Sequence, residues 1–413
     1  MGLNVKDTLF IQFFNKTKSG YYDLCNGFSD TWEICKARGD FLWVEHESDN
    51  DKWYDEDIYL DRALPISKGK VYISASYINH LFQAYTWATQ YADIDFVVGG
   101  PVAAERFTGK KGWNSVHFKV EKELPSNLKI TGQSIENLFN VPDFSGSWKL
   151  EVPDTVPENS RIYFSYTLEN QCYWKKCIFC TIAQHSKQHF RRRTNFDFEF
   201  KNLDFKGRKI VRLNTGSITP GHIKAILPNL PNGDDIEYRF FMRAAKAETN
   251  ALKQVIEKIG RGHLDCTLGF GIEFPSDHMW EYLDKGTSMT EVIETLEFCT
   301  WAGFKVNANV ILGWNNLIKD DLKDLEKFMD RFSERTVTTL QLRWLFAHPY
   351  TKIYETYDGV QNTIRLGPFN CGFNVSVNDR QKELNLAAAK IIKEKCLLKK
   401  IKLEGYKNLK KGE

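Results

Sequence analysis

The stretch "RIYFSYTLENQCYWKKCIFC", residues 161–180, decides how the rest of the chain is interpreted. Its first seven residues, 161–167, are rich in aromatic and β-branched side chains, which is typical of a strand. Three cysteines follow within nine residues, Cys172, Cys177 and Cys180, and the next cysteine is Cys266. A strand that leads directly into a cysteine loop predicts three thiols gathered at the carboxyl end of that strand.

Strands and helices alternate after this stretch. Apolar runs predict five more strands, and helical periodicity follows the first four of them. The five predicted strands are residues 208–216, 236–244, 265–273, 305–313 and 338–348. Six strands in such an α/β order predict a parallel sheet curved into a partial (β/α)6 barrel, and chemistry in these barrels sits at the carboxyl ends of the strands. The cysteine loop is therefore expected at the catalytic end.

A separate βαβ unit precedes the barrel. Residues 70–77 and 94–101 read as buried strands, and residues 79–93 read as the helix between them. Ligands of parallel sheets bind beyond the carboxyl ends of the strands. The binding edge predicted in this way contains Ser74, Ser76, Gly99, Gly100 and Pro101. The Gly-Gly-Pro sequence also suits a plain turn, and both interpretations remain open.

These patterns divide the chain into three parts. Residues 140–160 hold three prolines and little periodicity, which indicates a linker. We predict a Rossmann-like domain over residues 1–150, the barrel over residues 160–365 and a C-terminal helical extension over residues 366–413. Residues 20–65 are rich in Asp, Tyr and Trp and give no clear strand pattern.

Composition limits the possible partners and the compartment. The 413 residues include 56 basic and 53 acidic side chains, a net charge of +3, which gives no reason to expect nucleic acid or a membrane as a partner. No apolar run approaches the roughly 18 residues that a membrane span needs. Nine cysteines without an export signal favour a reducing environment, with thiols or metal rather than disulfides. We therefore expect a cytoplasmic protein.

Three thiolates in a loop suit a soft or borderline metal, either zinc or iron in a cluster. A structural zinc ion needs a fourth ligand, which His185 or His189 could supply, although the resulting spacing is not a common zinc pattern. That alternative would be a zinc-stabilised binding protein without catalysis. A four-iron cluster held by three cysteines leaves one iron open for a substrate or cofactor.

The cysteine loop resembles that of radical S-adenosylmethionine (SAM) enzymes. Their commonest spacing is C-x3-C-x2-C, and this chain has one residue more in the first gap. Residues 269–314 resemble the later half of the barrel of these enzymes, and residues 343–355 resemble its closing strand and turn. The matching positions are Glu273, Lys285, Gly286, Ala302, Gly303 and Gly313.

The resemblance implies a [4Fe-4S] cluster whose open iron is chelated by the amino and carboxylate groups of SAM. Reductive cleavage of SAM would yield a 5'-deoxyadenosyl radical that takes hydrogen from an unactivated carbon. An external electron donor such as flavodoxin or ferredoxin and a peptide or small-molecule substrate are implied as partners. The implied SAM-binding residues are Phe179, Thr215, Gly216, Arg243, Glu273 and Asn309. Arg243 would pair with the SAM carboxylate, and Glu273 would accept hydrogen bonds from the ribose.

The sequence "VVGGP", residues 97–101, resembles the cobalamin-binding domain of one large radical SAM subfamily. This second resemblance implies a cobalamin-dependent methyltransferase that acts on a peptide or natural product. The alternative keeps radical SAM chemistry without methyl transfer, such as epimerisation, oxidation, rearrangement or cross-linking, beside a vestigial cobalamin domain. The Asp-x-His-x-x-Gly pattern of a cobalt-ligating histidine is absent, and we interpret His80 as a surface or packing residue.

Overall fold

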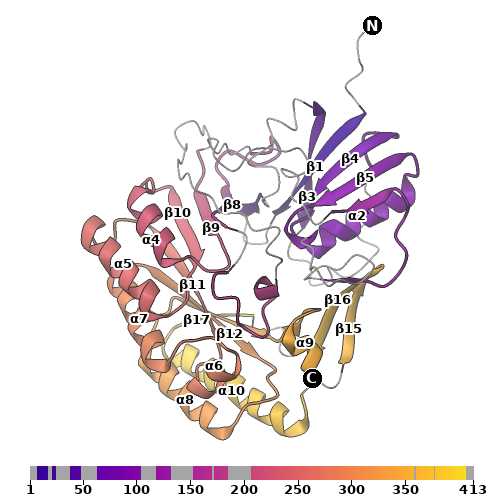
Figure 1. The fold of residues 1–413 in the computed structure, drawn as a ribbon. Helices are drawn as coiled ribbons and strands as arrows, with labels where there is room; N and C mark the ends of the chain where they lie inside the picture. The colour runs from indigo at the N-terminus through magenta and orange to yellow at the C-terminus, as the bar shows by residue number, and fades with distance from the viewer. Residues whose placement is uncertain are drawn as a thin grey trace.

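The structure, a computed structural model, describes ten segments of the chain. They are residues 7–16, 21–24, 38–47, 63–103, 118–131, 152–169, 172–184, 206–357, 360–375 and 377–405. Figure 1 shows a curved barrel wall lined on its outside by helices, a second α/β unit near the N-terminus, and a small sheet beside the barrel.

The barrel wall consists of parallel strands in the order in which they occur along the chain, with a last strand added from the C-terminal region. The strands are β8 (Arg161–Thr167), β9 (Lys209–Asn214), β10 (Ile236–Phe241), β11 (Cys266–Glu273), β12 (Lys305–Leu312), β13 (Thr339–Trp344) and β17 (Lys402–Glu404). The sheet continues past β8 into the N-terminal unit instead of closing on itself, so the barrel is partial, as predicted.

The helices cover the outer face of this wall (Figure 1). They are α4 (Pro220–Ile226), α5 (Lys246–Ile259), α6 (Asp277–Tyr282), α7 (Met289–Trp301), α8 (Lys319–Arg331) and α10 (Asp379–Leu398). Local sequence fixes where they begin: Ser288 and Glu291 form a reciprocal capping box on α7, and Asn378 caps α10. The predicted helices of the barrel are confirmed.

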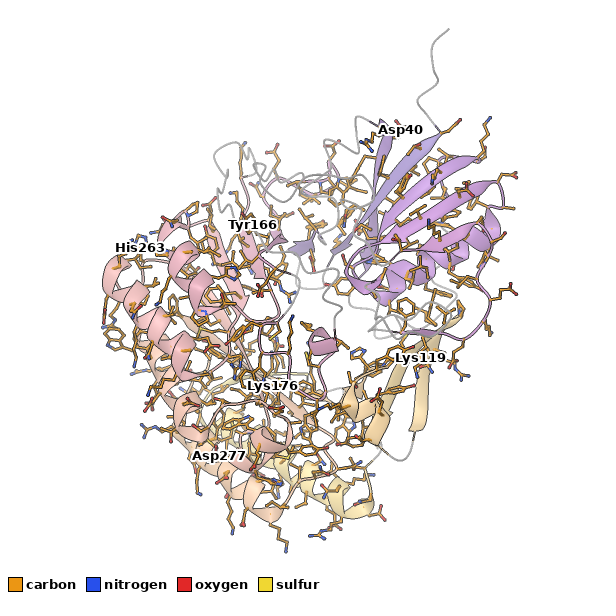
Figure 2. All side chains as sticks on the ribbon, in the orientation of Figure 1. Asp40, Lys119, Tyr166, Lys176, His263 and Asp277 are labelled. Atoms are coloured by element: carbon orange, nitrogen blue, oxygen red, sulfur yellow. The ribbon has the colours of Figure 1, made fainter. Side chains whose placement is uncertain are left out.

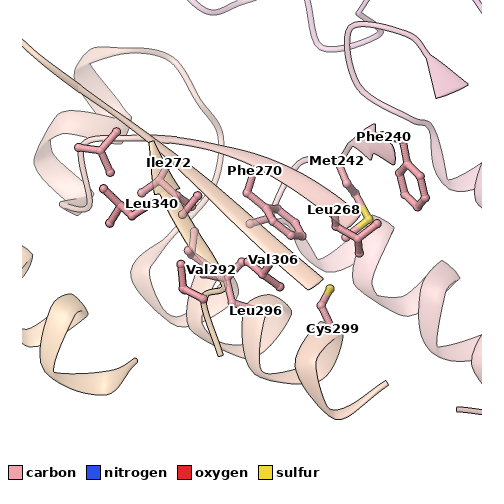
Figure 3. Packing of buried hydrophobic residues seen from close by; sticks show 14 of the residues in the cluster. Phe240, Met242, Leu268, Phe270, Ile272, Val292, Leu296, Cys299, Val306 and Leu340 are labelled. Carbon is pink, nitrogen blue, oxygen red and sulfur yellow. The ribbon is translucent and has the colours of Figure 1, made fainter. Parts of the chain in front are cut away.

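The alternation of side chains along the strands separates the core from the cavity. Phe240, Leu268, Phe270 and Val306 point to the helix side and are fully or almost fully buried, together with residues of α7 such as Leu296 (Figure 3). Each side chain of this size contributes about 1.5–3 kcal/mol when it is buried. Since successive residues of a strand face opposite sides, the residues between these point into the barrel.

The N-terminal unit is a parallel sheet with one described helix, α2 (Ile78–Gln90). Its parallel strands are β1 (Thr8–Lys16), β3 (Asp40–Glu47), β4 (Gly69–Ser74), β5 (Ile94–Gly99) and β7 (Leu128–Ile130). The predicted βαβ unit is confirmed as β4, α2 and β5. Sequence reasoning missed β1 and β3, although β1 forms the middle of this unit and pairs with both β3 and β4.

A short strand joins the two units. β2 (Tyr21–Asp23) runs antiparallel to β1 and parallel to β8, with Tyr21 opposite Arg161, and the Leu24 N–H donates to the Tyr163 carbonyl over 2.8 Å. One sheet of thirteen strands therefore runs through both units.

A second sheet occupies the rim between the units. It consists of β6 (Lys119–Val120), β14 (Phe346–Ala347), β15 (Val360–Leu366) and β16 (Phe369–Val375). The strand predicted over 338–348 is thus divided, because β13 stays in the barrel and β14 joins this second sheet. A short helix, α9 (Lys352–Thr356), connects β14 to β15. Residues 366–405 contain β16 and β17 as well as α10. Among the described helices, none combines the length and apolar character that a membrane crossing requires.

Candidate active site

A cavity of about 260 Å³ opens at the carboxyl ends of the barrel strands. All three cysteines of the loop line it, together with Glu273 at the end of β11 and Asn309 on β12. Figure 2 places Lys176, which belongs to the cysteine loop, near the middle of the molecule, where the barrel and the second sheet approach each other. The strand-end position predicted for the cysteines is confirmed.

Two neighbouring elements hold the cysteine loop. The Ile178 N–H donates to the Leu283 carbonyl beyond α6, and the Ile178 carbonyl accepts from the Ile353 N–H of α9, each over 3.3 Å. Cys180 and Cys177 are joined by a backbone hydrogen bond of 3.3 Å that closes a turn. The cysteine side chains are all half-buried. The loop is fixed through its backbone, so its thiols remain available to the cavity.

The long first gap of the loop docks onto the turn after α6. Lys175 takes a positive φ of 55°, which reverses the chain between the first two cysteines. The Trp174 indole N–H donates to the Asp284 carbonyl over 2.6 Å. At Gly286, with φ of 59°, an added Cβ would lie 2.2 Å from the Trp174 ring. The longer first gap therefore packs Trp174 against the turn after α6, and residue 286 must be a glycine to leave room for the ring.

Arg243 links the cysteine loop to the turn after α6. Its guanidinium donates to the Lys285 carbonyl over 2.7 Å, to the Gly286 carbonyl over 2.9 Å and to the Tyr173 hydroxyl over 3.1 Å. Burial lowers the pKa of Arg243, against the influence of the nearby thiols. The structure thus shows Arg243 as an anchor of the cysteine loop that also lines the cavity, and its pairing with a SAM carboxylate stays a prediction.

Glu273 and Lys285 form an ion pair in the cavity wall. The Lys285 ammonium and a Glu273 carboxylate oxygen are 3.0 Å apart, and their side chains are 13% and 9% exposed. Glu273 has a positive φ of 61°, at a point where the register between β11 and β12 shifts. Burial is the strongest single influence and lowers the pKa of Lys285, but the charge and hydrogen bond of Glu273, together with the nearby thiols of Cys177 and Cys180, raise it overall. Glu273 is therefore a buried side chain that pairs with Lys285 and has a left-handed backbone conformation.

The chemistry of the thiols fits a metal cluster only when they lose their protons. Burial raises the pKa of the Cys177 thiol to about 12, while the charge of Lys285 opposes this effect. Metal ligation requires the thiolate, so binding would release protons here. Among the described residues, no three His, Cys, Asp or Glu side chains converge on a position for a single metal ion. In a four-iron cluster each cysteine binds a different iron atom, so three thiols around one cavity provide the donor set that the cluster needs.

The other predicted SAM residues divide into two groups. Gly216, Phe179 and Asn309 line the cavity, and Gly216 allows a close approach of Cys172, whose Cβ would lie 2.7 Å from an added Cβ. The Asn309 Oδ1 atom is buried without a hydrogen-bond partner among the described residues. Thr215 is not part of the lining, and its buried hydroxyl bonds to Glu169 over 3.3 Å. A SAM contact at Thr215 has no support from this geometry.

Several cavity residues were not identified from sequence as site residues. In the sequence, Lys285 is indicated only by the "Lys-Gly" pattern. The turn after α6 brings its side chain next to Glu273. Trp174 and Arg343 also line the cavity. The sequence signal that could have indicated Trp174 is its place in the first gap of the cysteine loop, which is one residue longer than the commonest spacing. Arg343 lies on β13, and the resemblance over residues 343–355 indicated a closing strand and turn there but no role for this side chain.

The predicted cobalamin edge is assembled at the ends of β4 and β5. Ser74 and Gly99 are paired across these strands, and the Ala75 N–H donates to the Gly99 carbonyl over 2.8 Å. Gly100 has φ of 102°, and an added Cβ would lie 2.6 Å from the Ala75 carbonyl oxygen. The close approach that this glycine permits is to the neighbouring loop, so its contact with cobalamin stays a prediction. Pro101 begins a short 3-10 helix.

Of the three histidines considered as ligands, the structure describes only His80. His80 is fully buried and stacks on Phe13 with 4.3 Å between ring centroids, as expected for a packing residue. Ser76 donates its backbone N–H to the His80 ring over 3.2 Å. His185 and His189 lie outside the described residues.

The fold has solved counterparts, although no protein-family model and no curated protein matches the sequence. TsrM from Kitasatospora setae, a radical S-adenosylmethionine methyltransferase solved with tryptophan substrate and the SAM analog aza-SAM, superposes with a TM-score of 0.51 at 12% identity, over 86% of this chain and 77% of TsrM. TsrM with cobalamin and a [4Fe-4S] cluster gives 0.51 at 11% identity, over 86% and 79% of the two chains. OxsB, a cobalamin-dependent S-adenosylmethionine radical enzyme, gives 0.48 at 15% identity over 79% of this chain and 51% of OxsB.

The likeness to TsrM shows that this chain shares the fold of that enzyme, a partial (β/α) barrel preceded by an N-terminal Rossmann-like unit. The fold class predicted from the cysteine loop and the βαβ unit is thereby confirmed.

Proposed function

We propose that this chain is a radical SAM enzyme. The observation that carries the proposal is the convergence of Cys172, Cys177 and Cys180 on one cavity with the Glu273–Lys285 pair, at the carboxyl ends of the barrel strands. The likeness in fold to TsrM supports it. When bound, a [4Fe-4S] cluster with one open iron would supply the electron for reductive cleavage of SAM.

The residues of the chain have distinct tasks in this proposal. The three cysteines hold the cluster, and Trp174 with Arg243 keeps their loop in place. Glu273, which is paired with Lys285, is the acceptor for hydroxyl groups of the nucleoside. Phe179 packs edge-on against Trp314, with 5.8 Å between ring centroids, and closes the apolar side of the cavity. Such a lining limits the access of water to a reactive intermediate.

We further propose methyl transfer that depends on cobalamin, with a peptide or natural product as substrate. The N-terminal parallel sheet and its strand-end loops support this, together with the cobalamin bound by TsrM. An external donor such as flavodoxin or ferredoxin would supply electrons, and the cytoplasm is the proposed location. No nucleic-acid partner is proposed.

One observation favours a second candidate, a radical SAM enzyme without methyl transfer. The contact of Gly100 with Ala75 accounts for the glycine at that position without any ligand. In this candidate the N-terminal unit is a structural relative of a cobalamin domain, and the product carries no new methyl group.

Anaerobic purification and reconstitution with iron and sulfide test the core proposal. We expect about four irons per chain and an absorbance near 400 nm, and formation of 5'-deoxyadenosine from SAM under reduction. Cys177→Ala should lose both, whereas Cys371→Ala, at a buried cysteine of β16, should retain the iron. Stoichiometric zinc without iron would contradict the proposal. Titration with hydroxocobalamin distinguishes the two candidate functions. Binding of the cobalamin supports the methyltransferase, and no binding supports the enzyme without methyl transfer.

A further inference from the structure

A second cavity, of about 450 Å³, lies inside the barrel next to the cysteine cavity. Three arginines from three strands line it: Arg212 of β9, Arg239 of β10 and Arg343 of β13. Arg212 and Arg239 are directly opposite each other in the register of their strands, so both side chains leave the same face of the sheet. Asp23 and Tyr77, from the N-terminal unit, also line it.

The charges of this cavity are only partly compensated. Glu237 accepts a hydrogen bond of 2.6 Å from Arg239 and another of 2.8 Å from Thr267. Asp23 accepts from the Tyr77 hydroxyl over 3.5 Å. Arg212 lies against the Phe241 ring, 5.6 Å from its centroid, and Arg343 is exposed to the cavity. Among the described residues, no carboxylate lies within ion-pair distance of Arg212 or Arg343, so two guanidinium groups have no acidic partner.

This arginine cavity adjoins the cysteine cavity. Phe241, Asn309 and Arg343 line both of them. Gly269 keeps Phe241 flat against β11, because an added Cβ would lie 2.7 Å from the ring. The side chains of these shared residues therefore lie between the arginine cavity and the cysteine cavity, and the buried Asn309 oxygen is an acceptor without a partner among the described residues.

We propose that the arginine cavity binds the substrate, and that this substrate is a small molecule with a carboxylate or phosphate group held by Arg212 and Arg343. The proposal rests on the proposed function, since it is the neighbouring SAM site that makes this cavity a place for substrate. Guanidinium groups recognise these anions through paired, directional hydrogen bonds. The volume lies in the range of roughly 300–1,000 Å³ that is usual for small-molecule sites.

Calorimetric titration of the full chain with inorganic phosphate and with succinate tests the proposal, and succinamide is the neutral control. We expect one of the two anions to bind and succinamide not to bind. Arg212→Gln and Arg343→Gln should each weaken the binding about 10-fold, the loss of one charged hydrogen bond. Arg212→Lys, which keeps the charge, should lose less. Arg335→Gln, at an exposed loop position, is the matched control and should bind as the parent does.

Other results would overturn the proposal. If Arg212→Gln, Arg212→Lys and the parent bind both anions with equal affinity, Arg212 does not hold the anion. If the parent binds neither anion, the substrate is not held through a carboxylate or phosphate group. A third arm compares cobalamin with cobinamide, which lacks the nucleotide phosphate. If Arg212→Gln weakens only cobalamin, the cavity serves that phosphate and not a substrate. Iron content and 5'-deoxyadenosine formation, measured on the parent, report on the proposed function independently of these titrations.

Discussion

The guanidinium of Arg243 lies 3.8 Å from the centroid of a Trp174 ring. One residue comes from the third strand-to-helix connection of the barrel and the other from the cysteine loop. Their contact turns an unusually long gap between two cysteines into a defined structure.

Replacing Trp174 with Leu should loosen the cysteine loop. The change removes the contact with Arg243 and the hydrogen bond to Asp284, together worth about 1–3 kcal/mol. We expect a lower iron content after reconstitution, measured per folded chain. Trp301→Leu is the matched control, because Trp301 also stacks on an arginine, Arg261 at 4.5 Å, but lies far along α7 and is 52% exposed. Equal iron loss in both variants would contradict the role of Trp174.

Gly286→Ala should displace the same tryptophan. The added methyl group would clash with the Trp174 ring. The alanine would also have to adopt the positive φ of this position, which residues with a Cβ disfavour. Gly262→Ala provides the comparison, since Gly262 has φ of 66° but nothing within 4 Å of an added Cβ. The comparison variant should cost only the backbone strain, about 1 kcal/mol. Urea unfolding measures both, and equal costs would show that the Trp174 contact imposes no requirement at Gly286.

The Glu273–Lys285 pair should behave as a buried ion pair. Lys285→Met or Glu273→Gln alone leaves a partner without compensation in a largely buried site, which costs about 3–5 kcal/mol. The double variant should cost less than the sum of the two. Lys305→Met, which breaks the half-exposed pair with Asp265 at 2.8 Å, should cost about 1 kcal/mol or less. Chemical unfolding decides, and additive costs for Lys285 and Glu273 would show that the two charges are not coupled.

His348 should make the rim sensitive to acid. Burial lowers the pKa of His348 to about 4, below the ordinary value near 6.5. Since the folded form has the lower pKa, the folded state is favoured above pH 6.5, and this advantage is lost as the pH falls toward 4. Between pH 7 and pH 5 the free energy of unfolding should fall by about 2 kcal/mol more in the parent than in His348→Gln. His263→Gln, at an exposed histidine, should follow the parent, and identical pH curves for all three proteins would contradict the prediction.

Regular patterns carried most of the fold. The six barrel strands and the βαβ unit were predictable because each is an apolar run of ordinary length with turn residues at its ends. Two of the strands that were missed depend on partners rather than on local pattern, whereas β1 is an apolar-rich run of nine residues that a local pattern could have indicated. β17 has only three residues and is a strand because β13 offers an open edge. β6 has two residues, and β16 provides its pairing.

Only those parts of the site whose residues lie close together in the chain could be predicted from the sequence. The three cysteines lie close together in the chain, and their common cavity followed from the strand before them. The ion pair of Glu273 with Lys285 requires the turn after α6 to bring a residue twelve positions away back to the strand. The arginine cavity depends on register: Arg212 and Arg239 become neighbours only because β9 and β10 pair as they do.

The ladder between β2 and β8 has a mechanical consequence. Because Tyr21 to Asp23 are paired with Arg161 to Tyr163, the N-terminal unit cannot swing away from the barrel as a free lobe without first breaking main-chain hydrogen bonds. Asp23, the last residue of this ladder, is also part of the arginine cavity wall. The strand that couples the two units thus also places a carboxylate in the wall of the arginine cavity, so any separation of the units would change that wall.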